Sequence, residues 1–482
     1  MVLRDRIKII KLPHEVNFME KIVSDFIQFE ANSDIFNKKI NHLKFWSYVR
    51  FSIFWSFYSE EYFDGREFSK FKLIKKYISS FFYGFISLIR LLPKKYDILI
   101  LNTSRRSNLI DKKNVDVYTY PFINNLNKKY KILLLDISKF KNTNVYPCDF
   151  LPMRFASILN RIFSSLFTFT KKDKNYLNGV ELSLNKLFGK DINSSKIIMR
   201  EIIRHKIEYR LYKIIFKLFS PRILVYTNNG VIGGIIQAAN ELGVKTIELQ
   251  HGGISHLHIA YNSDKFDKKV LPSYFFSFGE YWNDAVKFKT EKINVGFPYM
   301  EYLESALPKD IQRKNDSILV ISKGKFERNL FVEITEKLLN SLQDFDIYYK
   351  LNPSEYDNWR EYYPTSFQKN PNLKIIDNNE KSLNYFYKKT KYLIGSGSTC
   401  VYEGVVNDMI VFVIKSLYFT DAKKLINNNS LFLASNANEI LSKIKNGEIP
   451  SGRINKEFMF KRCTSDSINN NIHKIFEEIH HN

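Results

Sequence analysis

The chain of 482 residues has only three cysteines, Cys148, Cys400 and Cys463, and they stand far apart. No pair has the C-x-x-C spacing of a zinc site, and the pattern does not support a disulfide framework. We therefore expect a reducing compartment. The Walker A pattern and the HExxH pattern are also absent, so a P-loop ATPase is disfavoured and no zinc-protease motif is present.

Long hydrophobic runs are missing as well. No stretch reaches the roughly 18 apolar residues of a spanning helix. Residues 1–18 lack the apolar core and cleavage site of a signal peptide, so we expect a cytoplasmic protein. Three aromatic or apolar segments, 45–55, 77–92 and 154–172, carry basic residues within or beside them. Such segments suit an anionic bilayer surface, which suggests peripheral attachment to the inner face of the membrane. Core packing is the alternative for each.

Acidic residues are outnumbered: 50 Asp and Glu face 73 Lys and Arg, which gives a net charge of +23. This balance suggests an anionic partner, such as nucleic acid, a membrane surface or a phosphorylated substrate. An AT-rich genome would produce the same bias. The abundant aromatic residues sit in apolar segments rather than in basic, Gly-rich platforms, so nucleic acid is not the expected partner.

Short apolar runs alternate with helical segments from residue 96 onward. The predicted strands are 96–102, 131–136, 222–226, 244–249, 274–278, 293–298, 317–321, 345–351, 374–376, 392–395 and 409–414. Helices between them make βαβ units with parallel strands. The predicted fold is therefore α/β, with two doubly wound, Rossmann-like domains facing a cleft, which is the default ligand site. The predicted divisions are a helical, basic and aromatic region 1–94, a first domain 95–292, a second domain 293–450 and a helical tail 451–482.

The first predicted domain carries polar residues after two strands. Asn229 lies in the turn after strand 222–226, and Gln250, His251, Gly252 and Gly253 follow strand 244–249. Ligands bind at the carboxyl ends of parallel strands. A histidine there can act as a base or donate to phosphate, and glycine lets the backbone approach a ligand. A structural turn is the equal alternative.

The second predicted domain has three comparable motifs. They are Lys323, Gly324 and Lys325 after strand 317–321, Asn352 and Pro353 after strand 345–351, and Ser396, Ser398 and Thr399 with Glu403 after strand 392–395. The hydroxyl-rich turn before a helix suits a phosphate, and Glu403 suits ribose hydroxyls. The basic glycine turn can neutralise a diphosphate. Plain helix capping and a solvated basic turn are the alternatives.

In this order the motifs resemble those of the GT-B glycosyltransferases that build bacterial capsule, lipopolysaccharide and teichoic acid polymers. The likeness is to the CDP-glycerol glycerophosphotransferase, capsular polysaccharide and bacterial sialyl- and polysialyltransferase groups. It covers roughly residues 220–420 and leaves out the N-terminal region.

The resemblance implies roles for several residues. His251 matches a catalytic histidine, Ser396, Ser398 and Thr399 match a motif that binds the donor phosphate, and residues 295–298 match the passage between domains. Asn352 and Pro353 stand where those families carry His-Pro. Because asparagine cannot carry a proton or a charge near neutral pH, CMP-sialic acid is in doubt as the donor.

The resulting hypothesis is a glycosyltransferase that moves a sugar from a nucleotide sugar to a growing bacterial surface glycan. The acceptor would be lipid-linked or an oligosaccharide. No DxD-like motif lies at a strand end, so neither a metal nor a further cofactor is expected. A sugar-nucleotide 2-epimerase of the same fold and a non-catalytic polysaccharide-assembly protein are the alternatives.

Overall fold

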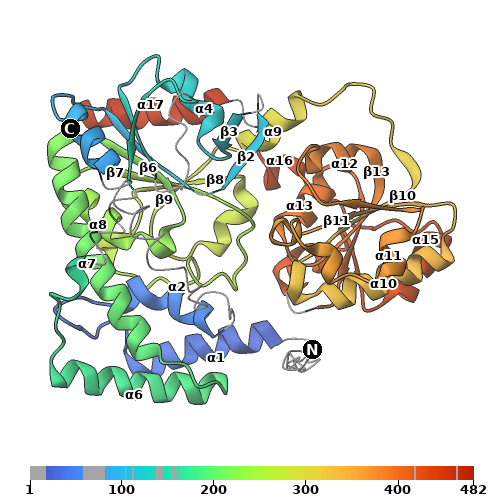
Figure 1. Ribbon diagram of the computed structural model, residues 1–482, viewed down its shortest axis with the longest axis horizontal. Coiled ribbons are helices and arrows are strands. Elements are labelled where there is room, and N and C mark those ends of the chain that lie inside the picture. The colour runs from blue at the N-terminus through green and yellow to red at the C-terminus, as the bar shows by residue number, and fades with distance from the viewer. Residues whose placement is uncertain are drawn as a thin grey trace.

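The computed structural model describes residues 18–57, 82–103, 105–110, 113–136, 145–153, 156, 159, 162–416, 419–462 and 465–481. Within these ranges the chain forms two lobes, each built on a parallel sheet (Figure 1). The basic residues expected to flank a membrane segment at 70–76, most of the segment 154–161, and Cys463 lie outside the described residues.

The first sheet has seven strands in the order β5-β4-β1-β6-β7-β8-β9. They are β1 (Ile98–Asn102), β4 (Ile132–Asp136), β5 (Asp149–Pro152), β6 (Ile223–Thr227), β7 (Lys245–Leu249), β8 (Tyr274–Ser277) and β9 (Glu291–Asn294). β9 pairs with β8, so the strand expected near residue 293 ends the first sheet. A separate antiparallel hairpin, β2 (Arg106–Ile110) and β3 (Lys113–Asp116), follows β1.

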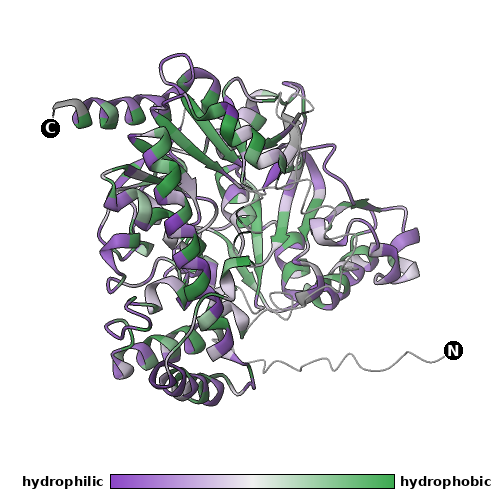
Figure 2. Cartoon of the chain, turned by 60° about the vertical axis from the view of Figure 1, so that its left-hand side comes forward, coloured by the Kyte–Doolittle hydropathy of each residue, from purple (hydrophilic) through white to green (hydrophobic). Residues whose placement is uncertain are grey.

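The second sheet has six strands in the order β12-β11-β10-β13-β14-β15. They are β10 (Lys314–Ile321), β11 (Asp346–Lys350), β12 (Leu373–Ile376), β13 (Thr390–Gly395), β14 (Ile410–Ile414) and β15 (Phe432–Ala434). Central strands such as β1 and β14 are buried along their whole length, which explains their unbroken apolar sequences. The two sheets form the apolar interior of the lobes (Figure 2).

Both sheets share one strand order. When the strands of each sheet are numbered along the chain, the first six follow the doubly wound order 3-2-1-4-5-6. This confirms the predicted fold class, with two Rossmann-like domains and a helical N-terminal region. The order reverses between β1 and β6 in the first domain and between β10 and β13 in the second. Ligands of such sheets bind at this reversal, outside the carboxyl ends of the strands.

Helices cover both sheets. In the first lobe these are α1 (Phe18–Ser33), α2 (Trp46–Ser56), α4 (Tyr120–Leu126), α6 (Lys171–Phe188), α7 (Ser194–Phe219), η2 (Asn229–Val231), α8 (Gly233–Glu241), η3 (Lys268–Val270) and η4 (Glu280–Ala285), with an unlabelled helix at 82–91. From the domain linker onward they are α9 (Pro298–Ser305), η5 (Gly324–Phe326), α10 (Arg328–Ser341), η6 (Pro353–Glu355), η7 (Trp359–Glu361), α11 (Thr365–Lys369), α12 (Leu383–Lys389), α13 (Thr399–Val406), η8 (Phe419–Ala422), α14 (Lys423–Asn427), α15 (Ala437–Lys445), α16 (Lys456–Met459) and α17 (Ser465–His481). α17 returns to the first lobe and packs beside α4 (Figure 1).

The N-terminal helices have a core of their own. α1 and α2 pack with α6 and the first half of α7 in one apolar cluster. Inside it, the buried Arg50 side chain donates to both carboxylate oxygens of Glu30, at 2.5 and 2.8 Å, and at 2.8 Å to Asn262 of the first domain. The segment 45–55, considered above for membrane contact, is therefore largely interior. Its charge is paired inside the protein instead of facing lipid.

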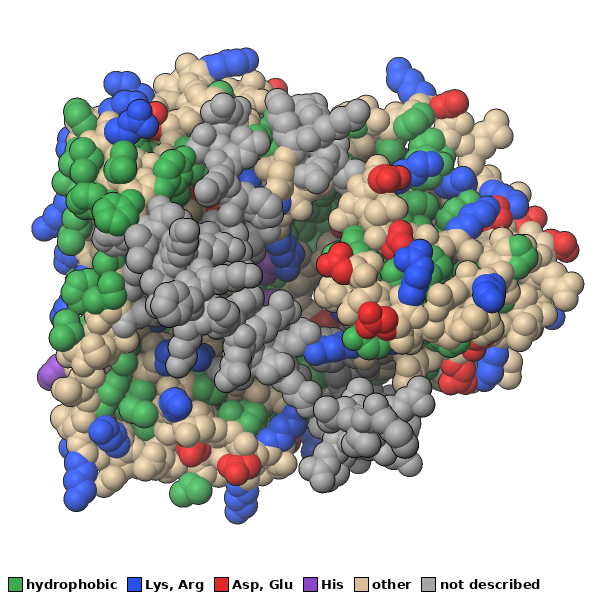
Figure 3. Space-filling model, viewed as in Figure 1, with side chains coloured by type: hydrophobic (Ala, Val, Ile, Leu, Met, Phe, Trp, Pro, Cys, Tyr) green, Lys and Arg blue, Asp and Glu red, His purple; other side chains and the backbone are tan. Residues whose placement is uncertain are grey.

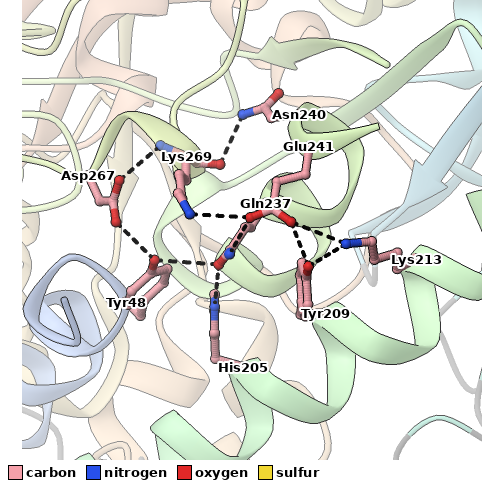
Figure 4. A network of polar contacts seen from close by, with 9 residues as sticks. All are labelled: Tyr48, His205, Tyr209, Lys213, Gln237, Asn240, Glu241, Asp267 and Lys269. Atoms are coloured by element: carbon pink, nitrogen blue, oxygen red, sulfur yellow. Dashed lines mark hydrogen bonds and ion pairs between the residues drawn. The ribbon is translucent and has the colours of Figure 1, made fainter. Parts of the chain in front are cut away.

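A polar network attaches this helical layer to the first domain (Figure 4). The Tyr48 hydroxyl of α2 donates to Asp267 at 3.2 Å, and His205 Nε2 of α7 lies 2.8 Å from Gln237 Oε1 of α8. The Gln237 amide then donates to Glu241 at 2.9 Å. Burial lowers the pKa of His205 to about 4, so its imidazole is neutral near pH 7.

Candidate functional site

The reversal point of the second sheet brings two of the predicted motifs together. Lys323, after β10, donates through Nζ to the Gly397 carbonyl in the loop after β13, at 3.0 Å. Gly324 has φ +70°, and a Cβ there would lie 3.2 Å from Cβ of Asn352. The close approach and the positive φ both favour glycine at this position. Lys325 follows in η5 and is exposed.

The hydroxyl-rich turn after β13 opens α13. Ser398 is the N-cap residue but makes no side-chain capping hydrogen bond, and Thr399 is the first residue of the helix. The Ser396 hydroxyl is buried, with the residue 1% exposed, and has no hydrogen-bond partner among the described residues. Backbone N–H groups at a helix start attract anions. The turn thus combines backbone N–H groups at a helix start with one buried hydroxyl, that of Ser396, which has no partner among the described residues.

Asn352 has a local task. Its Oδ1 accepts hydrogen bonds from the Ser354 backbone at 3.0 Å and the Ser354 hydroxyl at 2.8 Å. Pro353 begins η6 directly after it. This arrangement is the turn start considered above as the alternative, and it leaves only the Nδ2 amide group for a ligand.

Glu403 is held inside the second domain. Its carboxylate accepts a hydrogen bond from the Tyr387 hydroxyl at 2.8 Å, and burial raises its pKa. Burial also raises the pKa of Tyr118 in the first domain, and the charge of Glu403 contributes to that effect. Glu403 therefore lies close enough to influence the first domain electrostatically.

His251 follows β7 in the first domain. Its Nδ1 lies 3.4 Å from the Tyr261 hydroxyl oxygen, and that hydroxyl donates to Glu248 Oε1 at 2.7 Å. This chain of contacts favours the tautomer in which Nδ1–H faces tyrosine and Nε2 keeps its lone pair. Burial, assisted by His258 and Arg105, lowers the pKa of His251 to about 3. The imidazole is consequently neutral near pH 7, and its Nε2 lone pair is not protonated.

Two further residues hold the backbone of His251. Arg105 Nη1 donates to its carbonyl oxygen at 3.0 Å, and the Tyr118 hydroxyl donates to the same oxygen. The sequence analysis did not identify either residue. Arg105 comes shortly after β1, the strand at the reversal point, so a strand-end search at β1 could have found it. Nothing local in the sequence marks Tyr118.

The other first-domain candidates have different positions. Gln250 is buried and supports the loop: its Nε2 donates to the Gly252 carbonyl and its Oε1 accepts from the Phe278 N–H, both at 2.8 Å. Both ends of its amide are thus used inside the protein. Asn229 begins η2, two residues after β6 ends at Thr227.

Gly252 and Gly253 bring the two domains into contact. The Gly253 N–H donates to Thr399 Oγ1 at 2.8 Å, and a Cβ on Gly252 would lie 3.4 Å from the same oxygen. The histidine loop of one domain therefore rests against the start of α13 in the other. Basic and histidine side chains are visible in the hollow between the lobes (Figure 3). In the described part of the chain, no group of three or more His, Cys, Asp or Glu residues is arranged to hold a metal ion.

Comparison with known proteins yields structural likeness only. No family model and no curated protein matches the chain. The UDP-GlcNAc 2-epimerase of Methanocaldococcus jannaschii has a TM-score of 0.47 at 12% identity, over 78% of this chain and 99% of that one. The S. aureus MnaA–UDP co-structure has a TM-score of 0.49 at 11% identity, and the match covers 80% of this chain and 97% of that one. The glycosyltransferase of kitacinnamycin has a TM-score of 0.45 at 8% identity, and the match covers 80% of this chain and 96% of that one. Likeness this weak carries no information on substrate or reaction.

Proposed function

We propose that the protein is a glycosyltransferase that moves a sugar from a nucleotide sugar to a growing bacterial surface glycan. The observation that carries the proposal is the contact between Gly253 N–H and Thr399 Oγ1, at 2.8 Å. It places a neutral histidine of one domain beside the hydroxyl-rich helix start of the other. In this proposal, the acid–base group and the anion-binding groups come from different domains.

The second domain would hold the donor. The turn from Ser396 to Thr399 supplies hydroxyl and N–H groups to the phosphates, and Lys323 supplies a positive charge beside them. Charge develops on the phosphate oxygen as the bond to the sugar breaks. Hydrogen-bond donors and positive charges that are already positioned there stabilise the developing charge. This stabilisation is usually the largest contribution to such catalysis.

The first domain would activate the acceptor. The acceptor oxygen forms a bond to the anomeric carbon, the bond from that carbon to the donor phosphate breaks, and the nucleotide leaves with the electron pair. His251 Nε2 takes the proton of the acceptor hydroxyl. Negative charge from a bound diphosphate would raise the pKa of His251 above about 3, which makes the imidazole a stronger base.

A thermal-shift panel of CMP, CDP, UDP, GDP and their sugars tests the donor site. A ligand that binds the native state raises the melting temperature by mass action. We expect one nucleotide to stabilise the protein, and Ser398→Ala or Thr399→Ala to weaken that effect. Thr365→Ala, at the start of α11, is the matched control because it changes a helix start outside this turn. Absence of any nucleotide shift would contradict the proposal.

Product analysis separates transfer from the alternatives. The stabilising nucleotide sugar is incubated with and without lipid-linked and oligosaccharide acceptors. Glycoside formation that depends on the acceptor supports the transferase. An epimer formed without acceptor identifies a 2-epimerase, and nucleotide binding without either product favours an assembly protein.

We also propose that the protein acts at an anionic membrane surface. None of the described helices is long and apolar enough to cross a bilayer. Large apolar side chains are exposed on two of the segments considered above: Phe82, Tyr83, Phe85, Ile86, Ile89 and Leu92 on one, and Ile162, Phe163 and Leu166 on the other. Both segments pack into one core cluster, through Leu88 and Leu91 and through Leu159. They therefore belong to the same side of the first domain.

The charge around these segments favours anionic lipid as the occupant. Arg90, Lys171 and Lys172 are exposed next to the apolar side chains in sequence. Figure 3 shows hydrophobic and basic side chains together along the outer edge of the first lobe. An amphipathic surface with basic residues binds anionic bilayers through burial of its apolar side chains and through attraction of its positive charges to the lipid headgroups.

Liposome flotation tests the membrane proposal. Binding to vesicles of phosphatidylglycerol and phosphatidylcholine at low salt should fall strongly in the double variant Phe85→Ser, Ile86→Ser. Ile449→Ser is the matched control, since Ile449 is 71% exposed on the second lobe. Equal flotation of both variants, or none by the parent protein, would contradict membrane attachment.

A further inference from the structure

A small pocket lies where three parts of the chain meet. Its lining residues are Met19, Phe54, Trp55, Gly253, Ser255, Leu257, His258, Ile259, Thr420 and Asp421. They come from α1 and α2, from the loop after β7, and from η8 of the second domain. The cavity measures about 80 Å³. At roughly 10–15 Å³ for each water, it has space for about six waters, comparable to one monosaccharide ring and too little for a chain of sugars.

The pocket adjoins the candidate active site. Gly253, which lines it, is the residue whose N–H donates to Thr399 at 2.8 Å. The ring of His258, also in its wall, has its centroid 6.3 Å from that of His251. A group bound in the pocket would thus lie beside the proposed base.

The lining of the pocket combines apolar and polar side chains. Met19, Phe54 and Trp55 make an apolar wall, and the last of these is half-buried. The polar part of the lining includes the carboxylate of Asp421, which accepts from the Ser255 hydroxyl at 2.7 Å, and the hydroxyl of Thr420. An apolar wall with a few placed polar groups is typical of small-molecule sites. It suits a pyranose, which has C–H faces and a hydroxyl-bearing edge.

The hydroxyl of Thr420 is the feature of the pocket that indicates a ligand. The residue is 2% exposed, and its Oγ1 has no hydrogen-bond partner among the residues that the structure describes. A buried hydroxyl without a partner costs free energy, and a ligand hydroxyl would remove that cost.

The rim ties the N-terminal helices to the second domain. Glu20 of α1 lies 2.7 Å from Lys423 Nζ of α14 and 3.9 Å from His256 Nε2 of the loop after β7. The apolar wall is therefore anchored to both domains. Eight of the ten lining residues belong to the first lobe, which in the proposed reaction receives the acceptor.

We propose that this pocket binds the terminal monosaccharide of the acceptor glycan and that α1 and α2 set its specificity. The inference rests on the proposed transfer reaction, because it assigns the acceptor to the first lobe. A single pyranose ring is present both in the acceptor glycan and in the sugar of the donor. The test therefore measures binding of acceptor-like glycosides and binding of the nucleotide sugar separately.

Saturation-transfer NMR on the full chain is the test, with and without the stabilising nucleotide. The probes are methyl glycosides of glucose, galactose, mannose, N-acetylglucosamine and N-acetylgalactosamine. We expect at least one to bind, and its Kd to rise tenfold or more in Thr420→Val and in Trp55→Ala. Thr420→Ser should retain binding. Thr420→Val should leave the melting temperature unchanged or higher, because it removes an unpartnered buried hydroxyl. Tyr362→Ala, an exposed aromatic of the second domain, is the control.

Three outcomes would overturn the inference. In the first, no glycoside probe binds. In the second, glycoside binding is unchanged in both Thr420→Val and Trp55→Ala. In the third, these variants weaken binding of the intact nucleotide sugar, while free nucleotide and glycosides bind as they do to the parent protein. The last outcome would assign the pocket to the donor sugar. The proposed function is contradicted by a different result, namely that no nucleotide raises the melting temperature of the parent protein. Failure of the pocket proposal and failure of the proposed function are therefore distinguishable.

Discussion

The two domains share a strand order but differ at the point where that order reverses. In the second domain, the loops after β10 and β13 are joined by Lys323, and half-buried hydroxyls lie at the start of α13. In the first domain, α2 packs against the corresponding loop after β6. A Cβ on Gly230 would lie 3.1 Å from Cγ of Phe51 and 3.2 Å from Cβ of Ala260.

The loop after β1 is similarly committed. Asn102 is fully buried and accepts from the Thr119 hydroxyl at 2.7 Å, and Asp116 accepts from the Thr103 N–H and hydroxyl at the same distance. The same strand order therefore produces one reversal point with half-buried hydroxyls at a helix start and one that is filled from within the chain. The N-terminal helix α2 fills the side of the loop after β6, and residues of the first domain itself fill the side of the loop after β1.

The largest expected effect concerns the contribution of the first domain to chemistry. His251→Gln should lower the transfer rate by about 10²–10⁴-fold, since a positioned general base contributes that much. The His251 carbonyl, held by Arg105 and Tyr118, is unchanged by the substitution. Single-turnover kinetics with the identified donor measure the rate, and a thermal shift checks nucleotide binding. Near-parental transfer with intact binding would falsify the role of His251.

A second variant opens the filled reversal point. Phe51→Ala should lower the free energy of unfolding by about 2 kcal/mol, because it removes a half-buried ring from the contact with Gly230. Nucleotide affinity should not change, since the second domain holds the donor. Urea denaturation and a nucleotide titration give the two values. A second nucleotide site per chain, or a weaker first one, would show that the domains do not divide their tasks in this way.

The second domain is tested at its helix start. Thr399→Val should weaken nucleotide binding about tenfold, or about 1.4 kcal/mol, through loss of one hydroxyl partner for the phosphate. It also removes the acceptor of the Gly253 N–H. Isothermal titration of the parent, Thr399→Val and Thr399→Ser measures the joint contribution of this hydroxyl, with Ser expected to restore binding. Equal affinity in all three proteins would exclude Thr399 from the phosphate site.

At neutral pH the smallest effect is expected at the network that attaches α2, and this effect grows as the pH falls. His205 is protonated below pH 6.5 in the unfolded chain, but its folded pKa is about 4. Between these values the unfolded state binds more protons, so the stabilising contribution of neutral His205 falls as pH falls, by up to about 1.4 kcal/mol per pH unit. His205→Gln should flatten the decline in melting temperature from pH 6.5 to 4. A slope equal to that of the parent protein would contradict the buried neutral state.

Much of the fold was predictable from local patterns. The strands near 98–102, 223–227, 245–249 and 410–414 are short buried runs, and the structure confirms them within two residues. The hairpin β2–β3 and the short edge strands β5 and β15 were not predicted. β2, β3 and β5 carry polar residues, and β15 is apolar but only three residues long. The segment 45–55 has the same aromatic and basic character as the segment 77–92. Only packing shows that the first is interior, while residues 82–92 expose several of their apolar side chains.

The candidate site was predictable in part. Strand-end positions indicated His251 and Thr399, although the contact between their loops could not be read from the chain. Arg105 and Tyr118 were missed because their role depends on reaching a carbonyl far away in sequence. Asn352 was expected to face the donor, and its oxygen instead caps its own turn.

The sequence by itself determined the alternation of strands and helices, the parallel doubly wound sheets and the polar residues at the strand ends, because these follow from local apolar periodicity. Only the tertiary structure decided which reversal point is filled, where the pocket of Thr420 and Trp55 lies and that His251 is neutral. Each of these depends on burial and hydrogen bonds between segments distant in the chain, and those are set when the layers pack.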